Sequence, residues 1–420
     1  MARNLLPVAS LLLSVFFMMI GGGLAGYLLP LRAVGEGWST FHISMIATSY
    51  SLFFTLGCIV VPRMVLRVGH VRVFAVLAAL MSISLLMHAL IVDIPAWILI
   101  RGIAGFSIAG GYMVIESWLN ERVTNETRGA VFSVYMVVSM IGLMAGQYMV
   151  PLGNPMLPTL FMVCAVIYAM ALIPTGLSNA QSPQPLTQVS INLKQLYLTS
   201  PAAVIGCLLA GVIGGSWLNL APVYAQLSGL STASGATMLA LAMFGGALLQ
   251  IPLGRMSDRM DRRYVMAFAG GVGAFMCVLA MLFGTSNLYV FFAIMFMLGT
   301  VLFPIYALSV AHANDQAEAH EFVVISSGLL IVYGIGTIVG PMISGALMDQ
   351  MGPFAMFIVI GLGFLAYALH SLYRSYRRER ATEEERVEFQ PIPVTRNQTP
   401  QTYELDPRVD IDPEENADTA

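Results

Sequence analysis

The chain has little charge: 10% of its 420 residues are Asp, Glu, Lys or Arg, and Lys194 is its one lysine. A phosphate-binding loop needs a glycine-rich run that ends in lysine, whereas Lys194 stands in Asn-Leu-Lys-Gln. A Gly-x-Ser-x-Gly elbow is missing around Ser107, because Ala109 takes the place of the closing glycine. We therefore expect neither an ATP-driven pump nor any other enzyme.

Metal-type and disulfide-type spacings are also missing. The four cysteines all lie in apolar runs and are expected to behave as small hydrophobic residues: Cys58, Cys164, Cys207 and Cys277. His320-Glu321 is not followed by the second histidine of a zinc-protease motif. We predict no metal site, no cofactor and no nucleic-acid partner.

Apolar residues dominate instead. The chain is 57% hydrophobic with a mean hydropathy of +0.78, which is too apolar for a soluble domain. A membrane-spanning helix needs roughly 20 apolar residues, and twelve such runs are present. They begin near Leu5, Phe41, Val73, Pro95, Ala130, Met156, Pro201, Thr232, Tyr264, Asn287, Phe322 and Pro353. The first run is too long for a signal-peptide core, so we predict an all-α integral membrane protein with twelve transmembrane helices.

The chain contains an internal repeat, because residues 22–73 recur as residues 214–265. The shared residues include Gly22/Gly214, Gly23/Gly215, Pro30/Pro222, Gly37/Gly229, Ser39/Ser231, Arg63/Arg255 and Arg67/Arg259, followed at a slightly larger offset by Gly105/Gly299, Tyr112/Tyr306, Gly142/Gly336 and Gly146/Gly340. Two parallel six-helix repeats follow. We expect an N-terminal half at 1–177, a cytoplasmic loop at 178–200, a C-terminal half at 201–373 and a disordered cytoplasmic tail at 374–420.

Basic residues indicate the orientation, because cytoplasmic segments collect Lys and Arg. With an inside N-terminus, Arg32 alone falls outside, while the inner loops receive Arg63, Arg67, Arg72, Arg122, Arg128, Lys194, Arg255, Arg259, Arg262 and Arg263. We predict a multi-pass protein of the inner (plasma) membrane with both termini cytoplasmic. The tail's basic stretch is typical of a lipid anchor, and a regulatory role is the alternative.

The loop at 254–263 reads Gly-Arg-Met-Ser-Asp-Arg-Met-Asp-Arg-Arg. With the twelve helices and two repeats, it resembles the cytoplasmic signature of the major facilitator superfamily of secondary transporters, from which only Asp261 departs. The matching first-half loop has Leu66 at the acidic position. Glu116-Ser-Trp-Leu-Asn-Glu-Arg122, Arg101 with Gly105, and Gly340-Pro341 narrow the resemblance to the YcaD-like branch of bacterial transporters.

The resemblance implies a gate at the cytoplasmic loops. Asp258 is expected against the positive start of the fifth helix, near Arg128, where a carboxylate is favourable. Glu116 is expected to pair with Arg67 or Arg128, or simply to reach interfacial water. The gating residues implied by this reading are Asp258, Arg259, Arg262, Arg263, Glu116, Arg128 and Arg67.

Arg101 is the sharpest candidate for substrate binding. It lies about 9 Å along the helix from Pro95, and a charge at that depth is costly unless it faces water or a partner. The resemblance places this helix on the central path, while snorkelling to the outer surface is the alternative. Paired glycines and prolines in the first and seventh helices also mark binding sites and gates, although close packing would explain them too. The remaining candidates are Tyr27, Trp217, Asn219, Tyr306 and Gln147.

Together these features predict a monomeric secondary active transporter in the lipid bilayer. It would move a small molecule by rocking one half against the other, and Arg101 would suit a substrate with a carboxylate or phosphate. The resemblance implies coupling to protons, and efflux is mildly preferred over uptake. The alternative is a membrane receptor or sensor of the same fold that signals through its tail.

Overall fold

The computed structural model describes residues 8–177, 193–315, 317, 322–377, 387–393 and 399–404. Within these ranges it contains helices and no strand, and twelve helical spans are long and apolar enough to cross a membrane. The six spans of the N-terminal half are α2 (Ala9–Gly35), α3 (Thr40–Val68), α4 (His70–Leu90), α5 (Ile94–Arg122), α6 (Asn125–Met149) with η2 (Val150–Leu152), and α7 (Thr159–Met170) with α8 (Leu172–Gly176).

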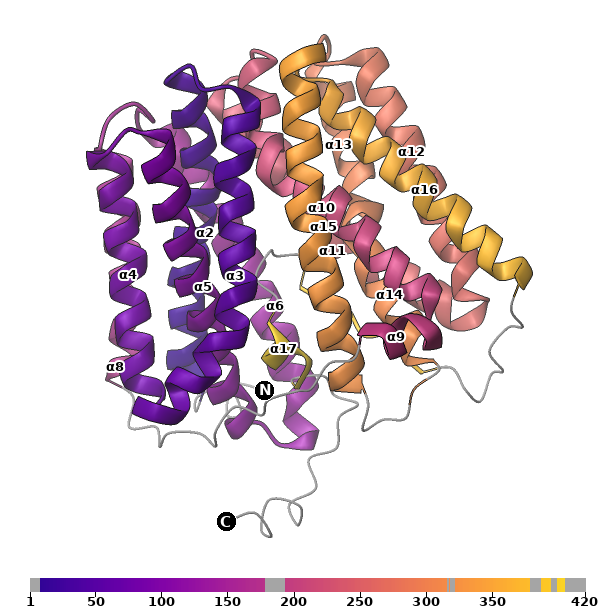
Figure 1. Cartoon of the computed structure of the whole chain (residues 1–420), viewed down its shortest axis with the longest axis horizontal. Coiled ribbons are helices and arrows are strands. Elements are labelled where there is room, and N and C mark those ends of the chain that lie inside the picture. Colours follow the sequence, from indigo (N-terminus) through magenta and orange to yellow (C-terminus); the bar gives the residue numbers. More distant parts are fainter. Residues whose placement is uncertain are drawn as a thin grey trace.

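The C-terminal half repeats this order. Its spans are α10 (Pro201–Leu227), α11 (Thr232–Arg259), α12 (Arg262–Phe283), α13 (Leu288–Leu302) with α14 (Pro304–Asn314), α15 (Phe322–Met351) and α16 (Ala355–Arg377). Figure 1 shows the two halves side by side. The predicted all-α fold with twelve spans is confirmed. Short α9 (Leu193–Thr199) lies within the predicted central loop, and residues 178–192 of that loop are outside the described residues.

The repeat extends to the backbone of the turns. The turn after α2 and the turn after α10 each contain a glycine with φ of 75°, Gly37 and Gly229. Ser39 and Ser231 then cap the next helix, and each side chain accepts a hydrogen bond from the backbone N–H three residues on. A serine at this position satisfies an otherwise unpaired N–H at the helix start. The sequence repeat is therefore also a repeat of local geometry.

Repeated glycines allow helices to meet at backbone distance. A Cβ on Gly23 would lie 2.0 Å from the carbonyl oxygen of Leu143, and one on Gly215 would lie 2.6 Å from the Cα of Thr337. Such contacts need a residue without a side chain. In each half the first helix thus packs directly on the fifth, α2 on α6 and α10 on α15.

We call the face where α2 begins and α16 ends the N-terminal face, and the opposite one the distal face. At the distal face the halves touch directly, with α3 along α15 and α2 against α10. The carboxylate of Asp349, near the end of α15, accepts hydrogen bonds from the backbone N–H of Thr40 at 2.7 Å and of Phe41 at 3.0 Å. One half therefore caps a helix of the other half.

The described part of the tail differs from the disorder predicted for 374–420, while residues 378–386, 394–398 and 405–420 lie outside the described residues. Helix α16 continues to Arg377, and residues 387–393 and 399–404 are placed against the helical body, with α17 (Pro400–Glu404) between the halves near the N-terminal face (Figure 1). Phe389, Thr399, Thr402 and Tyr403 are buried. Aromatic and hydroxyl side chains within the polar tail find partners on the helices, which a composition-based prediction of disorder does not register.

Candidate functional site

Arg101 lies near the distal start of α5 and points inward. It is 8% exposed, and its guanidinium carbon stands 4.4 Å from the centre of the Tyr50 ring on α3. A cation over an aromatic face is attracted to the ring, but this contact leaves the guanidinium N–H groups unused. The structure gives Arg101 no hydrogen bond or ion pair to any described residue, so its donors are available to a ligand.

A cavity opens in front of this guanidinium at the seam between the halves. About 60 Å³ of it is open to water, enough for a few water molecules at roughly 10–15 Å³ each. The N-terminal half contributes α2, α3, α5, α6 and α7, and the C-terminal half contributes α10 and α11. The polar and aromatic lining consists of Tyr50, Arg101, Tyr112, Gln147, Tyr168 and Trp217.

A second, smaller cavity continues from the first toward the distal face. It has about 30 Å³ open to water and shares Gly26, Arg101 and Leu218 with the first. Trp97 and Asn219 also line it. Since both cavities contain Arg101 and residues of both halves, movement of one half against the other would change the surroundings of this cation.

The six predicted substrate residues divide into two groups. Arg101, Trp217 and Gln147 line the main cavity, and Asn219 lines the smaller one. Tyr27 instead donates a hydrogen bond to the carbonyl of Thr232 at 2.7 Å, linking α2 to the start of α11. Tyr306 is hydrogen-bonded to the hydroxyl of Tyr403 in the tail. Four of the predicted residues are therefore brought together, whereas Tyr27 lies at a contact between the halves and Tyr306 at a contact with the tail.

Three tyrosines that line the cavity are not among the residues predicted from the sequence: Tyr50, Tyr112 and Tyr168. Tyr112 could have been predicted from the sequence, because it is the repeat partner of Tyr306. Its hydroxyl donates to the sulfur of Met19 at 3.2 Å. Tyr50 and Tyr168 carry no motif, and only the three-dimensional packing of α3 and α7 around α5 reveals them. The cavity is consequently a cation surrounded by aromatic rings.

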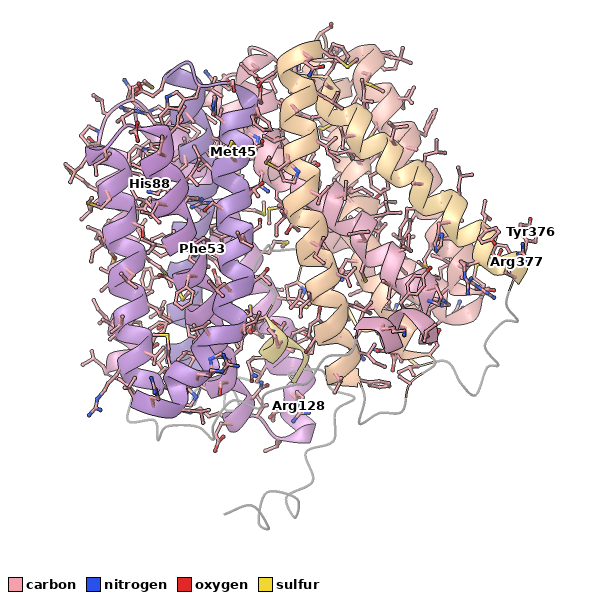
Figure 2. The ribbon with its side chains drawn as sticks, viewed as in Figure 1. Met45, Phe53, His88, Arg128, Tyr376 and Arg377 are labelled. Atoms are coloured by element: carbon pink, nitrogen blue, oxygen red, sulfur yellow. The ribbon has the colours of Figure 1, made fainter. Side chains whose placement is uncertain are left out.

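Glu116 lies near the other end of α5, toward the N-terminal face, and is fully buried. Its Oε1 accepts from the Tyr135 hydroxyl at 2.6 Å and from Thr402 at 2.9 Å, and its Oε2 accepts from Thr399. The alternative of a side chain in interfacial water does not fit this burial. The predicted partner Arg67 is exposed. Arg128 is buried at the start of α6, near the N-terminal face (Figure 2).

The signature loop forms a buried ion network in the C-terminal half. Arg262 holds Asp315 with two hydrogen bonds of 2.7 and 3.0 Å, and it donates to Asp258 at 2.9 Å. Burial raises the pKa of Asp315, and the Arg262 guanidinium opposes that shift. An arginine that binds a carboxylate through two hydrogen bonds fixes the orientation of that carboxylate. This network therefore fixes the position of the end of α11 relative to the end of α14.

The loop's departure from the family signature has a structural reason. Asp261 caps α12, accepting from the N–H of Arg263 at 3.0 Å, and pairs with its guanidinium at 2.7 Å. Burial alone would raise the pKa of Asp261, but the hydrogen bonds from Arg263 outweigh it and the pKa falls. The first-half position that matches Asp261 is Gly69, which has φ of 84°. Each half therefore starts its third helix differently.

The remaining gating candidates occupy the same face. Arg263 also donates to the carbonyl of Arg374 at 2.9 Å, and Arg259 is exposed. Asp258 accepts, besides the bond from Arg262, hydrogen bonds from the N–H of Phe389 at 3.1 and 3.2 Å. Its predicted contact with the start of α6 stays a prediction. Among the residues described, no cluster of three His, Cys, Asp or Glu could hold a metal.

Twelve spans in two similar halves, with a cavity at their seam, define a membrane transporter. Comparison with known proteins agrees: the sequence profile of the Major Facilitator Superfamily matches residues 11–324 and 229–401. The chain belongs to this superfamily and is not an enzyme.

Two relatives are informative. The chain is 27% identical over 373 residues to an uncharacterized MFS-type transporter of Enterobacter sp. (strain 638), covering 88% of this chain and 96% of that one. It is 25% identical over 365 residues to the uncharacterized MFS-type transporter YcaD of Escherichia coli O45:K1 (strain S88 / ExPEC), covering 86% and 94%. The predicted resemblance to YcaD-like proteins is thereby confirmed.

Solved structures share the fold. A mutant of the nucleoside transporter NupG superposes with a TM-score of 0.75 at 13% identity, covering 88% of this chain and all of that one. A bacterial homolog of the human lysosomal transporter Spinster, in an inward-facing and occupied conformation, gives 0.69 at 15% identity, covering 90% and 97%. At these identities the likeness concerns the fold alone.

Proposed function

We propose that this protein is a secondary active transporter of a small molecule with a carboxylate, phosphate or other electron-rich group. The observation that carries the proposal is Arg101, a buried guanidinium in a cavity between the halves, without a hydrogen bond to the described protein. A cation inside the hydrocarbon zone whose N–H groups have no acceptor costs several kcal/mol, and a ligand that accepts its hydrogen bonds would offset this cost. The aromatic rings around Arg101 suit an apolar or ring-bearing remainder of the ligand.

Transport would proceed by alternating access, in which the halves close one face while the other opens. In the described conformation the distal face is closed by contacts of α3 with α15 and of α2 with α10. The basic loops support a cytoplasmic N-terminal face in a bacterial inner membrane, with both termini inside. Proton coupling is supported by Glu116, a fully buried carboxyl on the same helix as Arg101. We keep efflux as the preferred direction and a monomer as the working unit.

The first test is a thermal-shift screen of the purified protein against metabolites and drugs. A bound ligand stabilises the folded state by mass action. Hits should be anionic or electron-rich, and Arg101→Gln should abolish their shifts. Arg63→Gln, which changes an exposed arginine, is the matched control. A hit whose shift is unchanged in Arg101→Gln would remove Arg101 from the binding site.

The second test measures flux of a confirmed ligand into vesicles that contain the purified protein. A transporter moves the ligand, and a proton-coupled one responds to an imposed pH gradient. The docked tail is the reason to test a sensor role as well. A sensor would release its tail when it binds the ligand, but it would not transport the ligand across the membrane. Binding without flux at any pH gradient would favour the sensor.

A further inference from the structure

The described part of the tail occupies the seam between the halves at the N-terminal face. On the C-terminal half, the N–H of Val387 donates to Asp315 at 3.1 Å, and the N–H of Phe389 donates to Asp258. Gln250 of α11 donates to the carbonyl of Ile392 at 2.9 Å. The backbone of residues 387–392 is thus held by side chains of the signature loop and its neighbours.

The N-terminal half holds the next part of the tail. Thr399 and Thr402 both donate to Glu116, and Asn120 donates to the carbonyl of Gln401 at 3.2 Å. All three bonds are buried, where the low local dielectric makes a hydrogen bond stronger than it is in water. One short segment therefore binds polar groups of both halves.

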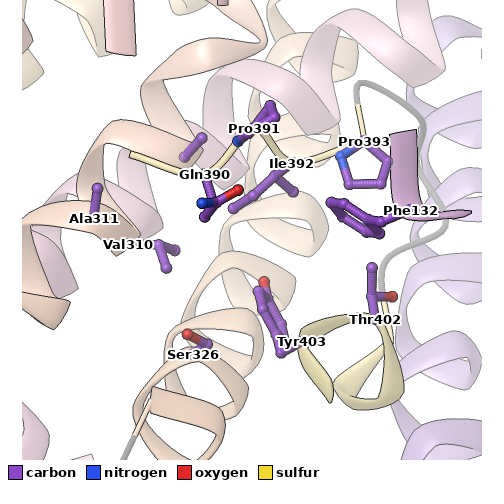
Figure 3. A pocket seen from close by; sticks show the side chains of 11 residues that line it. Phe132, Val310, Ala311, Ser326, Gln390, Pro391, Ile392, Pro393, Thr402 and Tyr403 are labelled. Atoms are coloured by element: carbon purple, nitrogen blue, oxygen red, sulfur yellow. The ribbon is translucent and has the colours of Figure 1, made fainter. Parts of the chain in front are cut away.

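Aromatic side chains fix the register of the segment. The ring of Phe389 lies so close to Gly254 that a Cβ there would stand 2.0 Å from a ring carbon. In the first half the matching position is Pro62, which has a side chain. The space that Gly254 leaves for an aromatic ring therefore exists in the C-terminal half only. The Tyr403 hydroxyl is hydrogen-bonded to Tyr306 of α14. A small cavity of about 20 Å³ remains between the tail and the helices (Figure 3).

We infer that the N-terminal opening of the transport path is a binding surface for the chain's own residues 387–393 and 399–403, which act together as a removable plug. This inference rests on the proposed function, because a plug matters only if the path carries a ligand. To close the N-terminal face the halves must approach each other, and the segment stands in the space between them. Docked, it both covers the path and holds the distal-closed state.

The same contacts connect the plug to the gate. Asp258 is bonded to Phe389, and Glu116 to Thr399 and Thr402. Release of the segment returns both carboxylates to other partners, including the predicted contact of Asp258 with the start of α6. The plug therefore competes with the latch that would close this face.

Cysteine labelling tests the plug without any substrate. Ala311 on α14 is buried and lines the cavity under the tail, so Ala311→Cys reports access in a background without the four native cysteines. In vesicles, a membrane-impermeant maleimide should react on the order of tenfold faster when Phe389→Ala and Tyr403→Ala loosen the tail. Deletion of 387–420 should give the same increase, whereas deletion of 405–420 alone should not. Equal rates in all these proteins would overturn the inference.

A peptide of residues 387–404 provides a second measurement. Fluorescence anisotropy should detect its binding to protein that lacks 387–420, and the peptide with both aromatic residues changed to alanine should bind at least about tenfold more weakly. No binding, or equal binding of both peptides, would contradict the plug. These measurements do not depend on flux, so a protein that shows the plug but moves no ligand would refute the proposed function alone.

Discussion

The two faces of the molecule are held together in different ways. At the distal face the halves contact each other directly, and Asp349 of one half caps a helix of the other. At the N-terminal face a segment of the tail lies between them and bonds to Glu116 on one side and to Asp258 and Asp315 on the other. In the proposed rocking motion the direct contact can break by itself, whereas the tail must first leave.

The two halves also differ in the polar groups that they place at the N-terminal face. Both have the same turns at Gly37 and Gly229, yet their N-terminal-face loops differ. In the C-terminal half Arg262 organises two carboxylates, while the first half has Leu66 at the acidic position and offers Glu116 inside α5 instead. A repeated scaffold therefore carries a different polar group in each half, and the tail has a sequence that fits both.

The largest expected effect comes from a substitution that overpacks the contact between the halves at the distal face. A Cβ on Gly345 would lie 2.7 Å from the Cβ of Ser44 across the seam, and overpacking of this kind costs about 1–3 kcal/mol. Gly345→Val should shift the protein toward a distal-open state, visible as a longer distance between spin labels at Val92→Cys and Ser286→Cys. Ile343→Val, on the exposed side of α15, is the control. An unchanged distance would mean that α3 and α15 are not the closing contact.

Arg101→Gln should have an effect of similar size, and it acts between the faces. Loss of a hydrogen bond to a charged group costs about 1.5–3 kcal/mol, which is roughly a tenfold to hundredfold loss of affinity. Titration calorimetry with a screened ligand measures this, with Arg63→Gln as control. The distances at both faces should stay unchanged, because Arg101 contacts the ring of its own half.

Asp349→Ala should have a smaller effect on the distal face. The Asp349 side chain is exposed and supplies a helix cap, and caps contribute typically about 1 kcal/mol. The distal-open population should rise about fivefold, as measured from the same label pair. Gln350→Ala, its exposed neighbour, should leave the population unchanged. If the two variants behave alike, the cap does not hold this face closed.

Leu66→Asp should have the smallest effect. It restores the acidic position of the signature in the first half, but Leu66 is exposed, and surface substitutions change stability by about 0.5 kcal/mol or less. The thermal midpoint and the labelling of Ala311→Cys should both match the parent protein, since the tail uses Glu116 in this half. Slower or faster labelling would mean that this loop also contacts the tail.

The sequence was sufficient for the fold because its signals are strong and local. Apolar length defines the twelve spans, and repeated glycines and serines define the two halves. Arg101 could be predicted because a charged side chain within an apolar run is costly unless it faces water, a partner or a ligand. Tyr50 and Tyr168 could not be found, because an aromatic residue in a membrane helix has no distinctive pattern until its neighbours are known.

The tail is where sequence reasoning was weakest. Its polar, proline-containing composition is typical of disorder, and the docking residues Phe389, Thr399 and Tyr403 are widely spaced within it. Their partners, Gly254, Glu116 and Tyr306, come from three different helices in both halves. Only the folded arrangement of those helices makes a complementary surface, so the segment's docking is a tertiary property.

The most direct test compares the two faces in one experiment, using pulsed spin-label distances in lipid nanodiscs. One label pair, Val92→Cys with Ser286→Cys, reports the distal face; the other, Arg72→Cys with Tyr264→Cys, reports the N-terminal face. The account predicts that deleting 387–420 gives a new population with a shorter N-terminal distance and a longer distal one, while deleting 405–420 changes neither. Unchanged distances at both faces after removal of 387–420 would contradict it.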